Sequence, residues 1–142
     1  MRRLAASLVA IAALSGCGGS GGLSDKDYRA KADAICASVR AQRDRLTPAS
    51  NLEELRAVAQ STIAINTDGL RRFKELDPPG DLKSPHAAIV SRLGETLRLQ
   101  QQALKAGQTR QTLQSINLRA RQTHAALVAA AQRAKLAACE LL

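Results

Sequence analysis

The chain has 142 residues, a formal net charge of +9 and a hydrophobic fraction of 45%, and Tyr28 and Phe73 are its only Tyr, Phe or Trp residues. This length allows one domain, whose core must be built from Leu, Ile, Val and Ala. Strands usually draw on β-branched and aromatic residues, whereas the abundant Ala, Leu, Arg and Gln are good helix formers. We therefore expect an all-α domain. The scarcity of aromatic side chains argues against nucleic-acid binding by base stacking.

The first 16 residues have the layout of a secretory signal peptide. Arg2 and Arg3 form a positive start, and an uncharged run of 11 residues, 4–14, follows. A run of this length is too short to span a membrane, which takes about 20 apolar residues. The segment ends in Leu-Ser-Gly-Cys at 14–17, not in an Ala-x-Ala site.

The Leu-Ser-Gly-Cys sequence resembles the lipobox of bacterial lipoproteins. In that family the Cys thiol receives a diacylglyceryl group, and the signal peptide is cut just before the Cys. The resemblance implies that Cys17 is lipidated and that its acyl chains hold the protein in membrane lipid, on the extracytoplasmic face of the cell membrane. An ordinary cleaved signal with a coincidental Cys is the alternative. The glycine-rich residues after Cys17 predict a flexible tether, so that the chain divides into 1–16, 17–23 and 24–142.

Residues 24–142 contain four amphipathic segments that are bounded by helix start and stop signals. Candidate N-caps are Ser24, which forms a capping box with Asp27, then Asn51, Ser84 before Pro85, and Thr109. The predicted ends are Leu46 before Thr47-Pro48, Leu76 before Asp77-Pro78-Pro79-Gly80, Gly107 as a C′ residue, and Leu141.

Each segment carries an apolar stripe whose members are mostly three, four or seven residues apart. Such stripes predict the side chains that face a shared core. They comprise Tyr28, Ala32, Ile35, Val39 and Leu46; Leu52, Leu55, Val58, Thr62, Ile65, Gly69, Phe73 and Leu76; Ile89, Val90, Leu93, Leu97 and Leu104; and Leu113, Ile116, Ala120, Leu127, Ala134, Ala137 and Leu141. Four such helices with short connections favour an antiparallel four-helix bundle.

Two cysteines, Cys36 and Cys139, remain once Cys17 is assigned to lipid. An exported protein can form disulfides. At 1.5 Å per residue, however, Cys36 lies about 15 Å from the first turn, and Cys139 lies about 45 Å along an unbroken fourth helix. A regular bundle would leave the two far apart. Pairing needs a fourth helix that bends, begins late, or unwinds at its end and folds back; two inert buried thiols are the alternative.

Several short motifs resemble those of small uncharacterised actinobacterial secreted or lipid-anchored proteins. These are YRAKADAIC at 28–36, LDPPGDL at 76–82, LKAGQ at 104–108 and the late cysteine. The resemblance implies that Cys36 and Cys139 form a disulfide. The KLAAC sequence at 135–139 departs from the pattern, because it lacks the glycine that usually precedes the last cysteine.

No pattern of catalytic, cofactor-binding or metal-ligating residues stands out. His86 and His124 have no neighbouring ligand pattern, and the glycines after Cys17 lack the lysine of a phosphate-binding loop. We expect His86 to be a polar first-turn residue and His124 to be partly buried and hydrogen-bonded. The sequence therefore predicts neither an enzyme nor a bound cofactor or metal.

Two kinds of function fit these observations. The first is a non-catalytic interaction module of the cell envelope that binds a protein or an anionic wall polymer. Its candidate basic surface comprises Arg71, Arg72, Lys74, Arg119, Arg121 and Arg133, for which a merely solvated basic face is the alternative. The second is a bundle that binds a small ligand or metal in an interior cavity beside His124.

Overall fold

The computed structural model describes residues 22–105 and 109–142. Within these ranges the chain is entirely helical, with no strand, which confirms the all-α prediction. Its elements are α1 (Asp25–Asp44), α2 (Leu52–Lys74), the 3-10 helix η1 (Gly80–Leu82), α3 (Lys83–Ala103), α4 (Arg110–Ala134) and the 3-10 helix η2 (Cys139–Leu141). The predicted signal peptide, Cys17, residues 18–21 and Gly107 lie outside the described residues.

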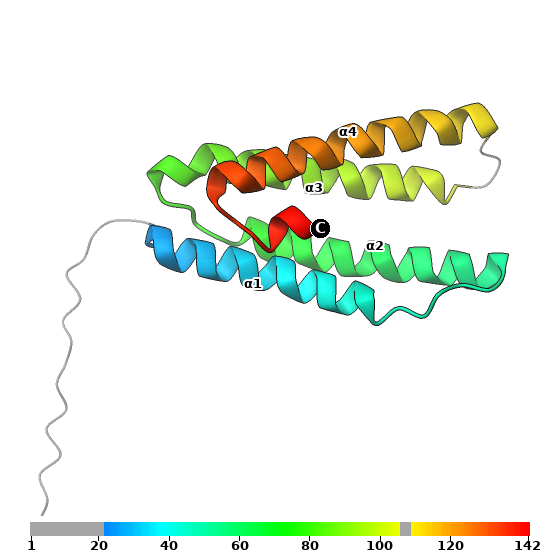
Figure 1. The fold of residues 1–142 in the computed structure, drawn as a ribbon, viewed down its shortest axis with the longest axis horizontal. Helices are drawn as coiled ribbons and strands as arrows, with labels where there is room; N and C mark the ends of the chain where they lie inside the picture. The colour runs from blue at the N-terminus through cyan, green and yellow to red at the C-terminus, as the bar shows by residue number, and fades with distance from the viewer. Residues whose placement is uncertain (1–21, 106–108) are drawn as a thin grey trace, which may run out of the picture.

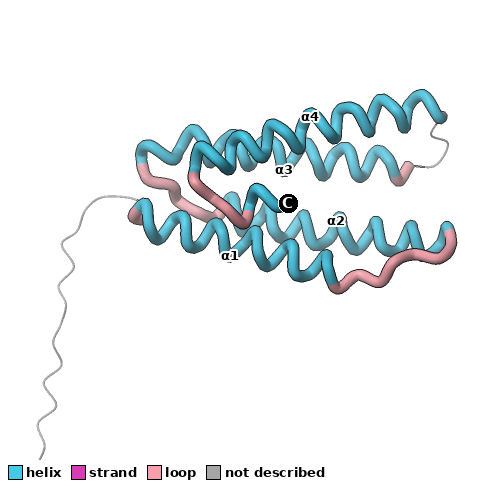
Figure 2. The backbone as a smooth tube through the Cα atoms, viewed as in Figure 1, coloured by secondary structure: helices cyan, strands magenta, loops and turns pink. Residues whose placement is uncertain are grey.

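The four long helices lie in two pairs, α1 beside α2 and α3 beside α4 (Figure 1). Consecutive helices run in opposite directions, and α2 also packs against α3 (Figure 2). One end of the molecule holds the start of α1, η1 and the end of α4. We call this the closed end. The other end holds the connection from α1 to α2, and we call it the open end.

Three of the four predicted N-caps are confirmed. Ser24 Oγ accepts a hydrogen bond from the Asp27 N–H at 3.1 Å, and Asn51 Oδ1 accepts one from the Glu54 N–H at 2.9 Å. Thr109 Oγ1 likewise accepts from the backbone N–H three residues on, at 3.1 Å. Each cap satisfies an N–H that has no partner inside its helix, which is worth about 1 kcal/mol.

The predicted N-cap of the third helix is wrong. Helix α3 begins at Lys83, so Ser84 is its second residue and Pro85 its third. The 3-10 turn before it runs directly into the helix: the Leu82 N–H donates to the Pro79 carbonyl at 2.9 Å, and the Leu82 side chain is buried. Proline is tolerated there because N–H groups in the first turn have no helical partner.

The fourth helix ends at Ala134, seven residues before the predicted Leu141. Lys135 has φ 57° and ψ 50°, the left-handed conformation, and the Leu136 N–H donates to the Ala131 carbonyl at 3.0 Å. Glycine usually occupies this position at a helix end. The chain then folds back and places η2 between α1 and α4 (Figure 1). Of the alternatives for the fourth helix, the structure adopts the unwound, folded-back end.

The core is concentrated at the closed end. Its buried residues are Tyr28, Ala32, Ile35, Cys36, Phe73, Leu82, Ile89, Leu127, Ala130, Ala131, Ala134, Leu136 and Cys139. Most of the predicted stripe is confirmed in this half of the molecule.

The predicted stripe is wrong at the open end and in the folded-back segment. Leu52, Leu55 and Leu113 are 63%, 55% and 44% exposed, and Leu141 is 61% exposed. Ala137 is exposed as well. The physical reason is that η2 lies between α1 and α4, so that these helices do not close over the open end. A cavity lies between the two helix pairs.

Candidate functional site

A central cavity of about 210 Å³ lies between the two helix pairs. All four long helices contribute to its wall, together with the last described residue. The lining residues are Ile35, Cys36, Val39, Arg43, Asn66, Gly69, Leu70, Phe73, Leu93, Thr96, Ala120, His124, Leu127 and Leu142. Most of them are apolar, as is usual for a ligand pocket with a few polar groups.

The directions of the four helices show which lining residues lie at each end of the cavity. α1 and α3 run towards the open end, whereas α2 and α4 run away from it (Figure 1). The closed end of the cavity is therefore lined by Cys36, Phe73 and Leu127, and the open end by Arg43, Asn66 and Thr96. The cavity is apolar at one end and polar at the other.

Hydrogen bonds fix the polar end. Arg43 Nη1 donates to the Leu142 carbonyl oxygen at 3.0 Å, which ties α1 to the folded-back segment. Asn66 Nδ2 donates to Gln100 Oε1 at 3.1 Å and connects α2 to α3. Thr96 Oγ1 donates to a backbone carbonyl of its own helix at 3.0 Å. The polar side chains are thus held in place at the rim before any ligand binds.

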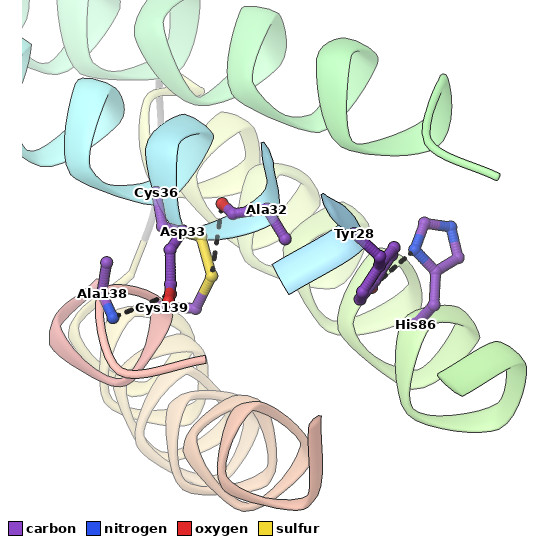
Figure 3. The surroundings of a disulfide bond; sticks show 7 residues. All are labelled: Tyr28, Ala32, Asp33, Cys36, His86, Ala138 and Cys139. Carbon is purple, nitrogen blue, oxygen red and sulfur yellow. Dashed lines mark hydrogen bonds between the residues drawn. A yellow bond between two sulfur atoms is a disulfide. The ribbon is translucent and has the colours of Figure 1, made fainter. Parts of the chain in front are cut away.

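The Cys36–Cys139 disulfide positions the folded-back segment (Figure 3). The two Cα atoms are 5.1 Å apart, and both cysteines are buried. Beside the disulfide, Asp33 Oδ1 accepts a hydrogen bond from the Ala138 N–H at 3.0 Å. These contacts hold the segment against α1, and Leu142 reaches the cavity wall as a consequence. The pairing that the resemblance implied is present in the structure.

His86 belongs to an aromatic cluster at the closed end. A hydrogen bond of 3.1 Å joins its Nδ1 to Tyr28 Oη (Figure 3). Its ring also stacks on Phe73, with the ring centroids 5.3 Å apart. Burial lowers the pKa of His86 and raises the pKa of Tyr28 to about 12. The prediction of a simple polar first-turn residue is therefore incomplete, because His86 is a half-buried packing residue.

His124 lies in the wall of the central cavity, yet it is exposed. The prediction that it is partly buried is wrong. Leu127 is the first buried apolar residue of α4, and His124 lies three positions before it on a part of the helix that is mostly exposed. The imidazole thus faces a position where a ligand could reach it.

The arginines of the predicted basic surface have carboxylate or amide neighbours. Arg71 forms ion pairs of 2.7 Å with both Asp68 and Glu75. These carboxylates raise the pKa of the Arg71 guanidinium. Arg72 lies 3.8 Å from Asp68, so one acidic residue faces two arginines.

The remaining members of that surface lie on α4. Arg119 forms an ion pair of 3.2 Å with Glu95 of α3, and Arg121 Nε donates to Asn117 Oδ1 at 3.2 Å. Arg133 lies in the last turn of α4, and Lys74 in the last turn of α2. The predicted residues are therefore spread over two helices, and neighbouring carboxylates offset part of their charge.

The polar rim of the cavity was missed by the sequence reasoning, although the stripe spacing contains a signal for it. Arg43 follows Val39 of the first stripe by four residues, and Asn66 precedes Gly69 of the second by three. Both positions continue the inward-facing pattern with polar side chains. A charged or amide residue in a core stripe was the available indication of a lined cavity.

Within the described residues no group of three or more His, Cys, Asp or Glu side chains could hold a metal ion. In the same part of the chain, no helix is long and apolar enough to cross a membrane. No protein-family model, curated protein or solved structure matches the chain.

Proposed function

We propose that this chain is a non-catalytic binding module of the cell envelope, anchored by lipid at the extracytoplasmic face of the membrane. The lipobox resemblance at 14–17 supports the anchor, with Cys17 as the acylated residue. Residues 18–23 then serve as the tether between membrane and domain. We further propose that the four helices act as one antiparallel four-helix bundle.

The central cavity carries the binding part of the proposal. A helical domain of this size would gain stability by burying its leucines, yet Leu52, Leu55 and Leu113 stay exposed at the open end. The central cavity itself is lined mostly by apolar side chains with a few polar groups at one end, as ligand pockets usually are. The cavity and its rim therefore support the binding of a small apolar or amphipathic ligand, which was the second of the two functions considered from the sequence.

The basic surface gives weaker support to binding of an anionic wall polymer. Arg71, Arg72 and Arg119 already face carboxylates of their own domain. Binding a polymer there would compete with these ion pairs. A protein partner that covers the open end remains compatible with the same exposed leucines.

Cell fractionation tests the anchor. We expect the wild-type chain in the membrane fraction, with an incorporated alkyne-labelled fatty acid, and the Cys17→Ala variant without the label. A variant that is processed and retained in membranes like the wild type would contradict the anchor.

Comparison of two variants of α4 tests the binding site. Ala120 lines the central cavity, whereas Ala125 is exposed on the same helix outside it. A compound or partner that co-purifies in a stoichiometric amount with Ala125→Phe, but not with Ala120→Phe, would support a module that binds at the cavity. Equal recovery with both variants would place binding elsewhere.

A further inference from the structure

The size of the central cavity suits a single hydrocarbon chain. Its volume is about 210 Å³. An apolar cavity of about 150 Å³ holds the six carbons of benzene, so this cavity has room for about eight carbons. An α-helix with its side chains is about 10–12 Å wide and would rest on the rim without entering.

The charged side chains of the lining indicate which head group the ligand carries. Arg43 lines the polar end, and among the described residues that line the cavity there is no Asp or Glu. One Arg43 N–H donates to the Leu142 carbonyl oxygen at 3.0 Å. A guanidinium has five N–H donors, so it can keep this bond and also bind a carboxylate. Among the described side chains that line the cavity, Arg43 carries the charge, and a cation favours an anionic head group.

We propose that the central cavity binds a medium-chain fatty acid of about ten carbons, with its tail towards the closed end and its carboxylate at Arg43. The tail contacts Phe73 and Leu127, and the carboxylate accepts hydrogen bonds from the guanidinium. This ligand class rests on the proposed function, because a domain tethered at a membrane is close to a source of acyl chains.

The direct test is a titration of the full chain, freed of bound small molecules, with decanoate labelled with carbon-13 at its carboxyl group. The carboxyl chemical shift and calorimetry report binding at concentrations below micelle formation. We expect saturable binding with a stoichiometry of one. In a series of chain lengths, affinity should rise about fourfold for each added methylene until about eight carbons are buried.

Two matched pairs of variants locate the ligand. Ala120→Phe fills the cavity mouth and should weaken decanoate binding at least tenfold, whereas Ala125→Phe should leave binding unchanged. Arg43→Gln should weaken decanoate binding about tenfold through loss of a charge-assisted hydrogen bond. Arg40→Gln, one turn away on the exposed side of α1, should have no effect. Circular dichroism and an intact disulfide verify that each variant is folded.

Several results would overturn the proposal. They are an absence of saturable decanoate binding, equal binding by Ala120→Phe and Ala125→Phe, and binding of decanol as tight as that of decanoate. Binding by Arg43→Gln equal to that of wild type would also remove the carboxylate assignment. A peptide helix that binds the open end in place of decanoate would show that this end of the molecule recognises a protein.

The ligand proposal and the proposed function fail in different experiments. If the chain is not membrane-anchored, fractionation shows it, and decanoate binding to the purified protein is still measured. If decanoate does not bind, the difference between Ala120→Phe and Ala125→Phe in co-purification still reports a binding module with another ligand.

Discussion

A Cβ atom added to Gly69 would lie 2.5 Å from Val39 Cγ2, in the wall of the central cavity. Real Cβ atoms do not approach a carbon this closely, so α1 and α2 pack at this point only because position 69 has no side chain. We expect Gly69→Ala to lower the free energy of unfolding by about 1–2 kcal/mol, since overpacking costs more than the gain in helix propensity. Urea denaturation measures the change.

Gly94 provides the control for this substitution. A Cβ atom there would meet Leu70 Cδ2 at 4.0 Å, which is an ordinary contact. Gly94→Ala should therefore raise the free energy of unfolding by about 0.5–1 kcal/mol through helix propensity alone. If both alanine variants change stability in the same direction, the close approach at Gly69 does not limit the packing of α1 on α2.

The left-handed conformation of Lys135 predicts that glycine stabilises the domain at this position. A non-glycine residue with φ 57° is strained by about 1 kcal/mol, and glycine is not. Lys135→Gly should raise the melting temperature, and Lys135→Val should lower it, because a β-branched side chain fits this conformation worst. Calorimetry of the two variants checks this order. A Gly variant less stable than the Val variant would show that α4 does not end in this turn.

Loss of the disulfide should cost much of the stability of the domain. Cys36 and Cys139 are 103 residues apart in sequence. In the chain-entropy model, closing a loop of this size lowers the entropy of the unfolded chain and so raises the free energy of unfolding by about 4–5 kcal/mol. The Cys36→Ala/Cys139→Ala variant should unfold at a clearly lower urea concentration than the oxidised wild type. Reductant should lower the midpoint of the wild type and leave that of the double variant unchanged. Two alkylatable thiols in the unreduced protein would contradict the bridge.

The burial of His86 predicts that the domain loses stability in mild acid. Burial lowers its pKa in the folded protein below the usual value of 6.5, so the unfolded chain takes up a proton first as the pH falls. Stability is therefore complete above about pH 6.5 and decreases below it, with a slope of at most about 1.4 kcal/mol per pH unit. Urea midpoints measured between pH 7.5 and 5 check the slope.

The control for the pH effect is the other histidine. His86→Phe keeps the stacking on Phe73 and should flatten the profile between these pH values. His124→Gln, which removes the other and exposed imidazole, is the matched variant. Glu95 does not interfere, because the hydrogen bond from Arg98 lowers its pKa further below this range. A profile that is unchanged by His86→Phe would show that another group titrates.

The helices themselves were predictable because their signals are local. Ser24, Asn51 and Thr109 precede helices in the sequence and form side-chain caps in the structure. Ser84 fails as a cap because a buried residue, Leu82, fixes a 3-10 turn that continues into α3. That burial depends on packing between segments far apart in the chain, which local spacing does not report.

The candidate site was less predictable than the fold. Periodicity identifies which face of a helix is apolar, as at Leu55 or Leu113, but it does not state whether another helix covers that face. Whether these faces are covered depends on the folded-back segment. That segment begins with a left-handed turn at Lys135, a position where glycine would have been the recognisable signal in the sequence. Without that turn, neither the disulfide nor the cavity follows from the spacing of the residues.

The folded-back segment also sets the order in which the domain can assemble. Contacts of α1 with the last residues span about a hundred positions: Arg29 with Ala134, Asp33 with Ala138, and Arg43 with Leu142. During synthesis α1 emerges long before these partners, so its apolar face is not yet covered. Such distant contacts slow folding. Formation of the Cys36–Cys139 disulfide, in which two electrons and two protons pass from the two thiols to an external oxidant, is thus a late event that marks a finished domain, and an incomplete chain would keep a free thiol on α1.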